Sequence, residues 1–282
     1  MSTSALPTIY LGGLPVSRLI VGGNPFSGFS HRSAEVDAAM MDYFTAARIR
    51  DALLRCERNG LTAMVLRGDR HIQRVVREYR SVGGRMHWIA QIASELADLP
   101  GHVRHLASLG ASAIFHHGSR TDNLWHADRL DEARDLLAVM RDTGLPTGLA
   151  SHIPEVIEHI EERGWDLDFY VCSAYNLNRR VRESQLVAGV RDDNGEVYDP
   201  ADRDRMLTTV RAVGKPCLII KVLAAGRHGD AQEATRAAFA YVIERIKPHD
   251  GMVVGVFPRD RDHVAENATI VRELCAAQAP AD

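Results

Sequence analysis

The 282-residue sequence has little of what marks the specialised classes of protein. Its 34 Lys+Arg and 37 Asp+Glu are nearly balanced, so it has no basic excess of the kind that nucleic-acid binding requires. No apolar run approaches the roughly 18–20 residues of a membrane-spanning helix. The first ten residues also lack the basic and apolar segments of a signal peptide. We therefore expect a cytoplasmic protein that acts on a small molecule and binds neither nucleic acid nor a membrane.

Cysteine is scarce as well, and its spacing excludes two further classes. Cys56, Cys172, Cys217 and Cys275 lie far apart, with no CxxC pair. This spacing predicts reduced, mostly buried thiols and not a disulfide frame or a zinc knuckle. No composition break or Ser/Pro-rich linker divides the chain, which predicts one domain over residues 1–282. The oligomeric state stays open.

Short apolar runs alternate along the chain with stretches of helical spacing, and a glycine usually precedes each run. The eight runs are Leu19–Gly22, Ala63–Leu66, His87–Ile92, Ala113–His116, Thr147–Ala150, Phe169–Cys172, Cys217–Val222 and Met252–Val256. Eight strand–helix units in a chain of this length match a (β/α)8 barrel. An open doubly wound sheet is the rival, but it usually has fewer strands. Two longer stretches, 24–42 and 178–199, follow strand ends and are predicted to be rim or lid loops.

Four segments resemble the aldo/keto reductase superfamily. They are LGGLPVSRLIVGG, GLASHIPEVIEHIEERGWDLDFYVCSAYNLNRR, KVLAAGR and GVFPRDRDHVAEN, in the order in which the superfamily has its counterparts. The resemblance implies a barrel closed by an N-terminal β-hairpin. It also implies that Arg259, Glu266 and Asn267 contact the phosphate end of NADP, and that Tyr175 and Asn176 lie beneath the nicotinamide.

The catalytic tetrad of that superfamily is mostly missing. Its Asp, Tyr, Lys and His surround the nicotinamide, but the aspartate position is here Val65, or Leu66 one residue on, and the lysine position is Gln91. One histidine is retained, as His116 or His117. A neutral amide cannot replace the lysine that tunes the proton donor, so the standard reductase mechanism is not expected.

Polar residues at the ends of the predicted strands form the candidate site. Because side chains alternate along a strand, one of the two consecutive histidines must point away from the barrel. The candidates for proton transfer are His116, His117, Lys221 and Tyr175. The candidates for substrate binding are Asn24, Arg67, Asp69, Gln91, His152 and Asn176.

Each candidate also has a purely structural interpretation. Asn24 can set a tight loop with Pro25, Arg67 and Asp69 can pair at the rim, and His152 can cap the next helix. Lys221 lies in an apolar run, where its ammonium needs a carboxylate, cavity water or a lowered pKa.

Cofactors stay open between NADP, a divalent metal and none. A metal could be shared by His116 or His117, His152 and either Asp69 or Gln91, although the sequence has no HxH or HExxH motif.

Three functions follow from these patterns. The first is an isomerase, epimerase or lyase that acts on a small polar carbonyl- or sugar-like compound by acid–base chemistry, without hydride transfer. The second is a diverged NADP-dependent oxidoreductase. The third is a catalytically inactive barrel that serves as a binding subunit.

Overall fold

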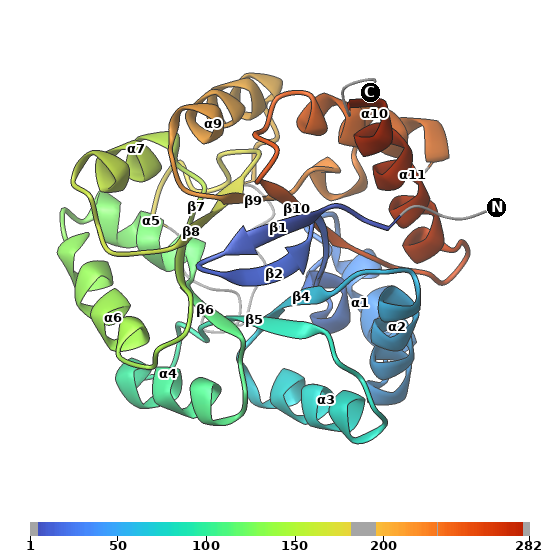
Figure 1. Cartoon of the computed structure of the whole chain (residues 1–282), viewed down its shortest axis with the longest axis horizontal. Helices are drawn as coiled ribbons and strands as arrows, with labels where there is room; N and C mark the ends of the chain where they lie inside the picture. The colour runs from blue at the N-terminus through green and yellow to red at the C-terminus, as the bar shows by residue number, and fades with distance from the viewer. Residues whose placement is uncertain (1–4, 182–195, 230, 279–282) are drawn as a thin grey trace.

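The computed structural model describes residues 5–181, 196–229 and 231–278. Eight parallel strands close into a barrel in the order β10-β3-β4-β5-β6-β7-β8-β9, with helices around it (Figure 1). This confirms the predicted (β/α)8 barrel, and each strand lies within two residues of a predicted run. The strands are β3 (Leu19–Gly22), β4 (Ala63–Arg67), β5 (His87–Gln91), β6 (Ala113–His116), β7 (Thr147–Ser151), β8 (Phe169–Ser173), β9 (Cys217–Ile220) and β10 (Gly251–Gly255).

The outer helices bury one face each against the barrel. In α3, Ile72, Val75, Val76 and Tyr79 are buried at helical spacing, and the Asp69 carboxylate caps the first turn by accepting from the Ile72 amide at 2.9 Å. The described α-helices are α1 (Ala34–Tyr43), α2 (Ala46–Arg58), α3 (Arg70–Ser81), α4 (Leu99–Ser108), α5 (Gly118–His126), α6 (Asp131–Arg141), α7 (Pro154–Glu162), α9 (Pro200–Ala212), α10 (Gln232–Ile243) and α11 (His263–Gln278).

An antiparallel hairpin of β1 (Thr8–Leu11) and β2 (Leu14–Ser17) crosses the N-terminal end of the barrel (Figure 1). Gly12 and Gly13 turn the chain at φ +54° and +86°, a conformation that glycine adopts without a Cβ clash. Ile9, Leu11 and Val16 pack into the barrel interior against the inward side chains of the strands. The hairpin implied by the resemblance is therefore present, and it leaves the C-terminal end of the barrel as the open one.

The first predicted rim loop is partly helical. Residues 24–42 contain the 3-10 helix η1 (Asn24–Ser27) and most of α1, so this rim segment is not a loop throughout. Pro25 fits the first turn of η1, and the Ser33 hydroxyl caps α1 by accepting from the Val36 amide. In the second predicted loop, 178–181 and 196–199 have no regular secondary structure, while 182–195 lie outside the described residues.

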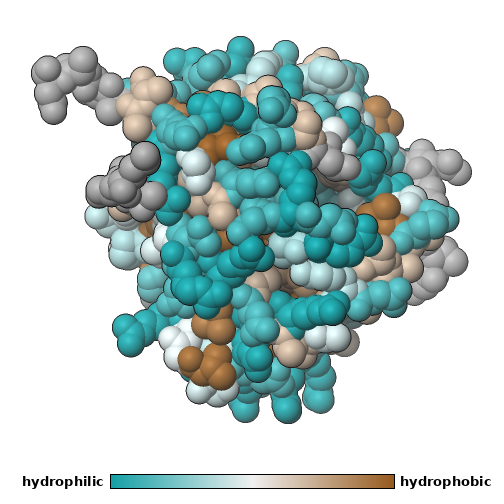
Figure 2. All heavy atoms as spheres, turned by 90° about the vertical axis from the view of Figure 1, so that its right-hand side faces the viewer, coloured by the Kyte–Doolittle hydropathy of each residue, from teal (hydrophilic) through white to brown (hydrophobic). Residues whose placement is uncertain are grey.

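The surface and the thiols agree with the composition. Among the described helices, none is both long and apolar enough to cross a bilayer. The face on the side of α2 and α11 is mostly hydrophilic, with hydrophobic residues scattered over it (Figure 2). The four cysteines are free, as predicted, and Cys56, Cys172 and Cys217 are buried.

Candidate active site

A cavity of about 440 Å³ opens at the C-terminal ends of the barrel strands. Its floor is apolar and consists of inward side chains of the strands, namely Val65, Phe115, Ala150, Val171, Ile220 and Val253. This is the end at which (β/α)8 enzymes bind and convert their substrates.

A ring of polar side chains surrounds the cavity above this floor. Each comes from the last residue of a strand or from the one or two residues after it. The inward alternation of the strand continues at all of these positions except Lys221, which directly follows the inward Ile220 and lies in a left-handed turn. Its members are Asn24, Arg67, Gln91, His117, His152 and Lys221. The structure thus brings six of the predicted site residues together.

His152 is held by a buried carboxylate. Asp122 of α5 is fully buried, and its Oδ2 lies 2.7 Å from His152 Nδ1. Asp122 also accepts from the Ser151 hydroxyl at 2.6 Å and from the His152 amide at 3.3 Å. A carboxylate at Nδ1 selects the tautomer with the proton on that nitrogen, which leaves Nε2 as a lone-pair acceptor. The alternative that His152 caps α7 is wrong, since Ile153 is the N-cap residue and no side chain caps that helix.

The two consecutive histidines point in opposite directions, as strand alternation requires. His117 lines the cavity with Nδ1 2.9 Å from Ser94 Oγ, and burial together with nearby Arg67 lowers its pKa to about 3. His116 is fully buried outside the cavity, with Nδ1 2.7 Å from Thr121 Oγ1. The prediction that His116 could act on substrate is therefore corrected, and His117 is the member that faces the barrel mouth.

Arg67 lies on the cavity and also pairs with Asp69 at the rim. Its guanidinium lines the cavity, while Nε lies 3.4 Å from Asp69 Oδ2 and a terminal nitrogen contacts Glu95. Asp69 itself lies outside the cavity lining, because its other oxygen caps α3. The prediction of Asp69 as a substrate-binding residue is corrected to that of a residue that holds Arg67.

The outer rim is closed by a contact between the two predicted rim segments. His31 Nδ1 lies 2.7 Å from Glu196 Oε1, and Nε2 lies 3.1 Å from Asn24 Nδ2. Because Asn24 Nδ2 can only donate, Nε2 accepts and Nδ1 donates to the carboxylate. Burial, with the charge of Lys221 second, lowers the pKa of His31 to about 4. The imidazole that joins the two segments is therefore neutral at neutral pH.

Lys221 follows β9 and was predicted inside that strand. The strand ends at Ile220, and Lys221 adopts φ +62°, followed by Ala224 at +47° and Ala225 at +54°. Non-glycine residues in this left-handed region are strained, and such residues concentrate at functional sites. The turn directs the chain around the cavity, which Lys221 lines.

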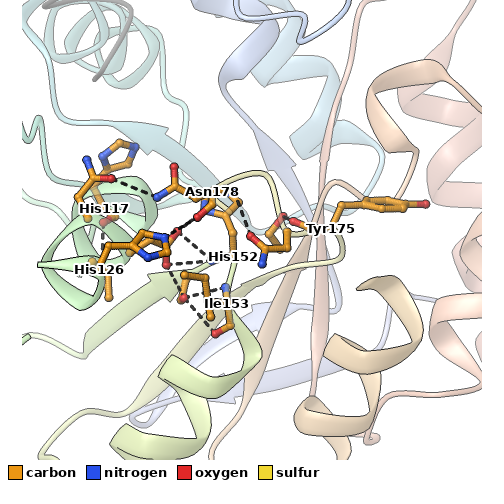
Figure 3. A network of polar contacts seen from close by, with 12 residues as sticks. His117, His126, His152, Ile153, Tyr175 and Asn178 are labelled. Atoms are coloured by element: carbon orange, nitrogen blue, oxygen red, sulfur yellow. Dashed lines mark hydrogen bonds and ion pairs between the residues drawn. The ribbon is translucent and has the colours of Figure 1, made fainter. Parts of the chain in front are cut away.

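Tyr175 and Asn176 do not reach the cavity. Figure 3 shows the Tyr175 ring pointing away from His117 and His152. Its hydroxyl lies 3.1 Å from His228 Nε2, and its ring packs 5.1 Å from that of Tyr198.

Asn176 turns back on the chain, with Oδ1 accepting from the Asn178 amide at 3.1 Å. The predicted catalytic role of Tyr175 and the binding role of Asn176 are corrected to packing and loop closure, because the chain leaves the barrel axis directly after β8.

The start of α11 forms a side wall of the cavity. Glu266 and Asn267 line it together with Arg261, which pairs with Glu266 at 2.5 Å. Arg259 is exposed, pairs with Asp260 and lies outside the lining, so its predicted cofactor contact is not supported by its position. Arg261 occupies the place at the cavity that the sequence assigned to Arg259.

The residues fit NADP chemistry poorly. No tyrosine occurs in the described cavity lining, and the tyrosine that should lie beneath a nicotinamide points away from the cavity. The positions of the superfamily aspartate and lysine lie on the cavity as Val65 and Gln91. Within the described part of the chain, no three His, Cys, Asp or Glu side chains are grouped as a metal site requires.

Asp122, His31 and Glu196 were missed by sequence reasoning. Asp122 lies on a helix and reaches the site only because α5 packs against β7, so no strand-end pattern could select it. His31 and Glu196 come from segments 165 positions apart. The one local signal was the acidic residue within the first turns after a histidine-rich strand end, in HHGSRTD.

No protein-family model matches the chain, and no curated protein matches its sequence. Solved structures share its fold. A thermostable aldo-keto reductase has a TM-score of 0.56 at 15% identity over 96% of this chain and 99% of that one. Glycerol dehydrogenase from Gluconobacter oxydans has a TM-score of 0.53 at 12% identity, covering 100% and 98%. Dihydropteroate synthase from Xanthomonas albilineans has a TM-score of 0.55 at 15% identity, covering 98% and 100%. These enzymes differ in reaction type, so the likeness establishes the barrel and no single reaction.

Proposed function

We propose that the chain is an enzyme that transfers protons on a small polar carbonyl- or sugar-like compound, as isomerases, epimerases and lyases do, without hydride transfer. The observation that supports this most is the contact between Asp122 and His152. A fully buried carboxylate at Nδ1 leaves a basic Nε2 on an imidazole that lines the cavity. That arrangement is typical of a general base.

The other polar side chains of the ring have matching roles. His152 removes a proton from the carbon beside a carbonyl, and the oxygen gains negative charge. Arg67 and Lys221 provide the cationic donors that stabilise this charge, and Gln91 donates an amide hydrogen bond. His117 is the second group that can exchange a proton with the product. General acid–base catalysis contributes about 10²–10⁴-fold, and donors placed at a developing oxyanion add about 10²–10³-fold.

The experiment is hydrogen–deuterium exchange on substrate candidates in deuterated buffer, followed by proton NMR. A panel of pyruvate, hydroxypyruvate, dihydroxyacetone and glyceraldehyde covers charged and neutral small carbonyl compounds. The proposal expects enzyme-dependent deuterium incorporation beside the carbonyl of at least one compound. His152→Gln should lower this rate about 100-fold or more. Arg74→Gln, at an exposed residue of α3, is the matched control and should not change it. Exchange that is absent throughout, or unaffected by His152→Gln, would overturn the proposal.

The alternative is a diverged NADP-dependent oxidoreductase. One observation favours it, namely that the cavity extends to Glu266 and Asn267 at the start of α11. The orientation of Tyr175 and the presence of Gln91 oppose it. NADPH added at millimolar concentration distinguishes the two, because a bound cofactor raises the melting temperature and changes its own fluorescence.

A further inference from the structure

Building on the proposed function, we infer that the substrate is an anion, with a carboxylate or phosphate group that binds between Arg67 and Lys221. These two cations line the cavity from β4 and from the turn after β9, strands that are not neighbours in the barrel. A ligand that spans the apolar floor can therefore contact both.

The charges around the cavity are unequal. The cationic members of its lining are Arg32, Arg67, Lys221 and Arg261, whereas the carboxylates of its described lining are Glu196 and Glu266. Glu266 is paired with Arg261 at 2.5 Å, and Glu196 bonds to the neutral imidazole of His31 at 2.7 Å. The described lining therefore offers a ligand more cationic than anionic side chains to contact.

Two carboxylates hold Arg67 from outside the cavity lining. Asp69 and Glu95 contact the guanidinium and offset part of its charge, although neither belongs to the lining itself. They restrict the orientation of Arg67, whose side chain is only 12% exposed. An arginine fixed in this way is prepared to bind an oxyanion with little loss of side-chain entropy.

Burial is the main reason why the pKa of the His117 imidazole is lowered, and neighbouring charges add to this effect. The charged and titratable groups that influence it are Arg67 of β4, His152 after β7, His116 of β6 and Arg120 of α5, with Arg67 the strongest of them. Asp122 faces His152, and Glu95 contacts Arg67. In this surrounding His117 is neutral, and it has Ser94 Oγ as its hydrogen-bond partner at 2.9 Å.

A bound anion changes the electrostatic contribution to this pKa. Its charge offsets that of Arg67 and raises the pKa of His117 above about 3, while burial continues to lower it. In the pH interval between the free and the bound pKa, binding takes up a proton, so affinity falls as pH rises. The substrate would thus favour protonation of His117, the second group that exchanges a proton in the proposed reaction.

The test compares ligands that differ in charge but little in shape. Malonate is paired with malonamide, and glycerol 3-phosphate with glycerol. Dissociation constants come from calorimetry and ligand-observed NMR. Each anion should bind at least about tenfold more tightly than its neutral partner, equivalent to about 1.4 kcal/mol. The tighter of the two anions then identifies the substrate as a carboxylate or a phosphate ester. Equal affinity within both pairs would overturn the inference.

Variants of the two cationic residues test where the anion binds. Arg67→Gln and Lys221→Met should each remove most of the preference for anions, and Lys221→Met is informative even if loss of the Arg67 ion pairs impairs folding. Arg74→Gln is the control with equal loss of charge at an exposed site. Calorimetry in buffers of different ionisation enthalpy should show proton uptake that His117→Gln abolishes. Retained anion preference in both cavity variants would place the anion elsewhere and contradict the inference.

The experiments distinguish a failure of the proposed function from a failure of the anion site. Anion binding without any deuterium exchange on the carbonyl panel would overturn the proposed function and leave the anion site standing. Exchange on neutral compounds alone, with no preference for anions, would overturn the anion site and leave the proposed function standing.

Discussion

His152 Nδ1 lies 2.7 Å from Oδ2 of Asp122, a carboxylate with no exposed surface. His152 directly follows β7 and Asp122 lies on α5, so the barrel and its helical layer must pack correctly to form the pair. The bond determines which imidazole nitrogen is available to the cavity. The proposed chemistry depends on this one contact more than on any other.

Asp122→Asn should therefore reduce proton-exchange activity more than it reduces stability. The amide can donate to Nδ1 and favour the wrong tautomer, so we expect a loss of about 100-fold or more. The lost charge-assisted bonds to Ser151 and His152 should lower the free energy of unfolding by about 1–3 kcal/mol. The exchange rate and urea unfolding measure these two effects. Asp135→Asn, on the exposed face of α6, is the control, and equal activity in both variants would contradict the account.

Gly118→Ala should displace the His152 ring. A Cβ at position 118 would lie 3.2 Å from His152 Cε1 and 3.4 Å from Ala150 Cβ, closer than most such contacts. We expect a folded protein with about tenfold lower activity, since small misplacements of a catalytic group are costly. Gly214→Ala, where the nearest contact is 3.4 Å from Glu161, is the matched control. Activity close to that of the native protein would show that His152 is not held as tightly as the structure implies.

Buried His116 should make the protein sensitive to acid. Its pKa falls from 6.5 to about 3 because burial disfavours the charged form. Between these values the unfolded chain binds the extra proton, so stability is complete above about pH 6.5 and falls as pH decreases. His116→Asn should reduce the dependence of unfolding free energy on pH in this range by up to about 1.4 kcal/mol per pH unit. Chemical denaturation at several pH values measures it, and an unchanged slope would refute the prediction.

Variants of Lys221 separate the effect of backbone strain from the effect of the side-chain charge. Glycine at this position relieves roughly 1–2 kcal/mol of left-handed strain and loses roughly 0.5–1 kcal/mol through chain entropy. Lys221→Gly should therefore be about 0.5–1 kcal/mol more stable than Lys221→Met, while both lose activity. Thermal unfolding and the exchange assay give the comparison. Lower stability of the glycine variant would show that the turn is not strained.

The sequence predicted the barrel well because strand–helix alternation is a local pattern. It also predicted the members of the ring that alternate inward at strand ends, among them Arg67, Gln91, His117 and His152. It could not predict that the chain turns outward after β8, which removes Tyr175 and Asn176 from the site. The resemblance to reductases was misleading at these two residues, because a shared motif does not preserve the orientation of a side chain.

The contacts that were missed are those between distant elements. Asp122 meets His152 through helix packing, and His31 meets Glu196 across 165 positions. Neither partner has a periodicity or spacing that points to the other. Such pairs follow from the tertiary structure, and they are also the contacts that set protonation in this cavity.

The most direct test of the account is the tautomer of His152, measured by nitrogen-15 NMR of the imidazole. The account predicts that Nδ1 carries the proton that faces Asp122 and that Nε2 is the lone-pair acceptor, with a loss of this preference in Asp122→Asn. A native protein in which Nε2 carries the proton and Nδ1 does not would contradict it.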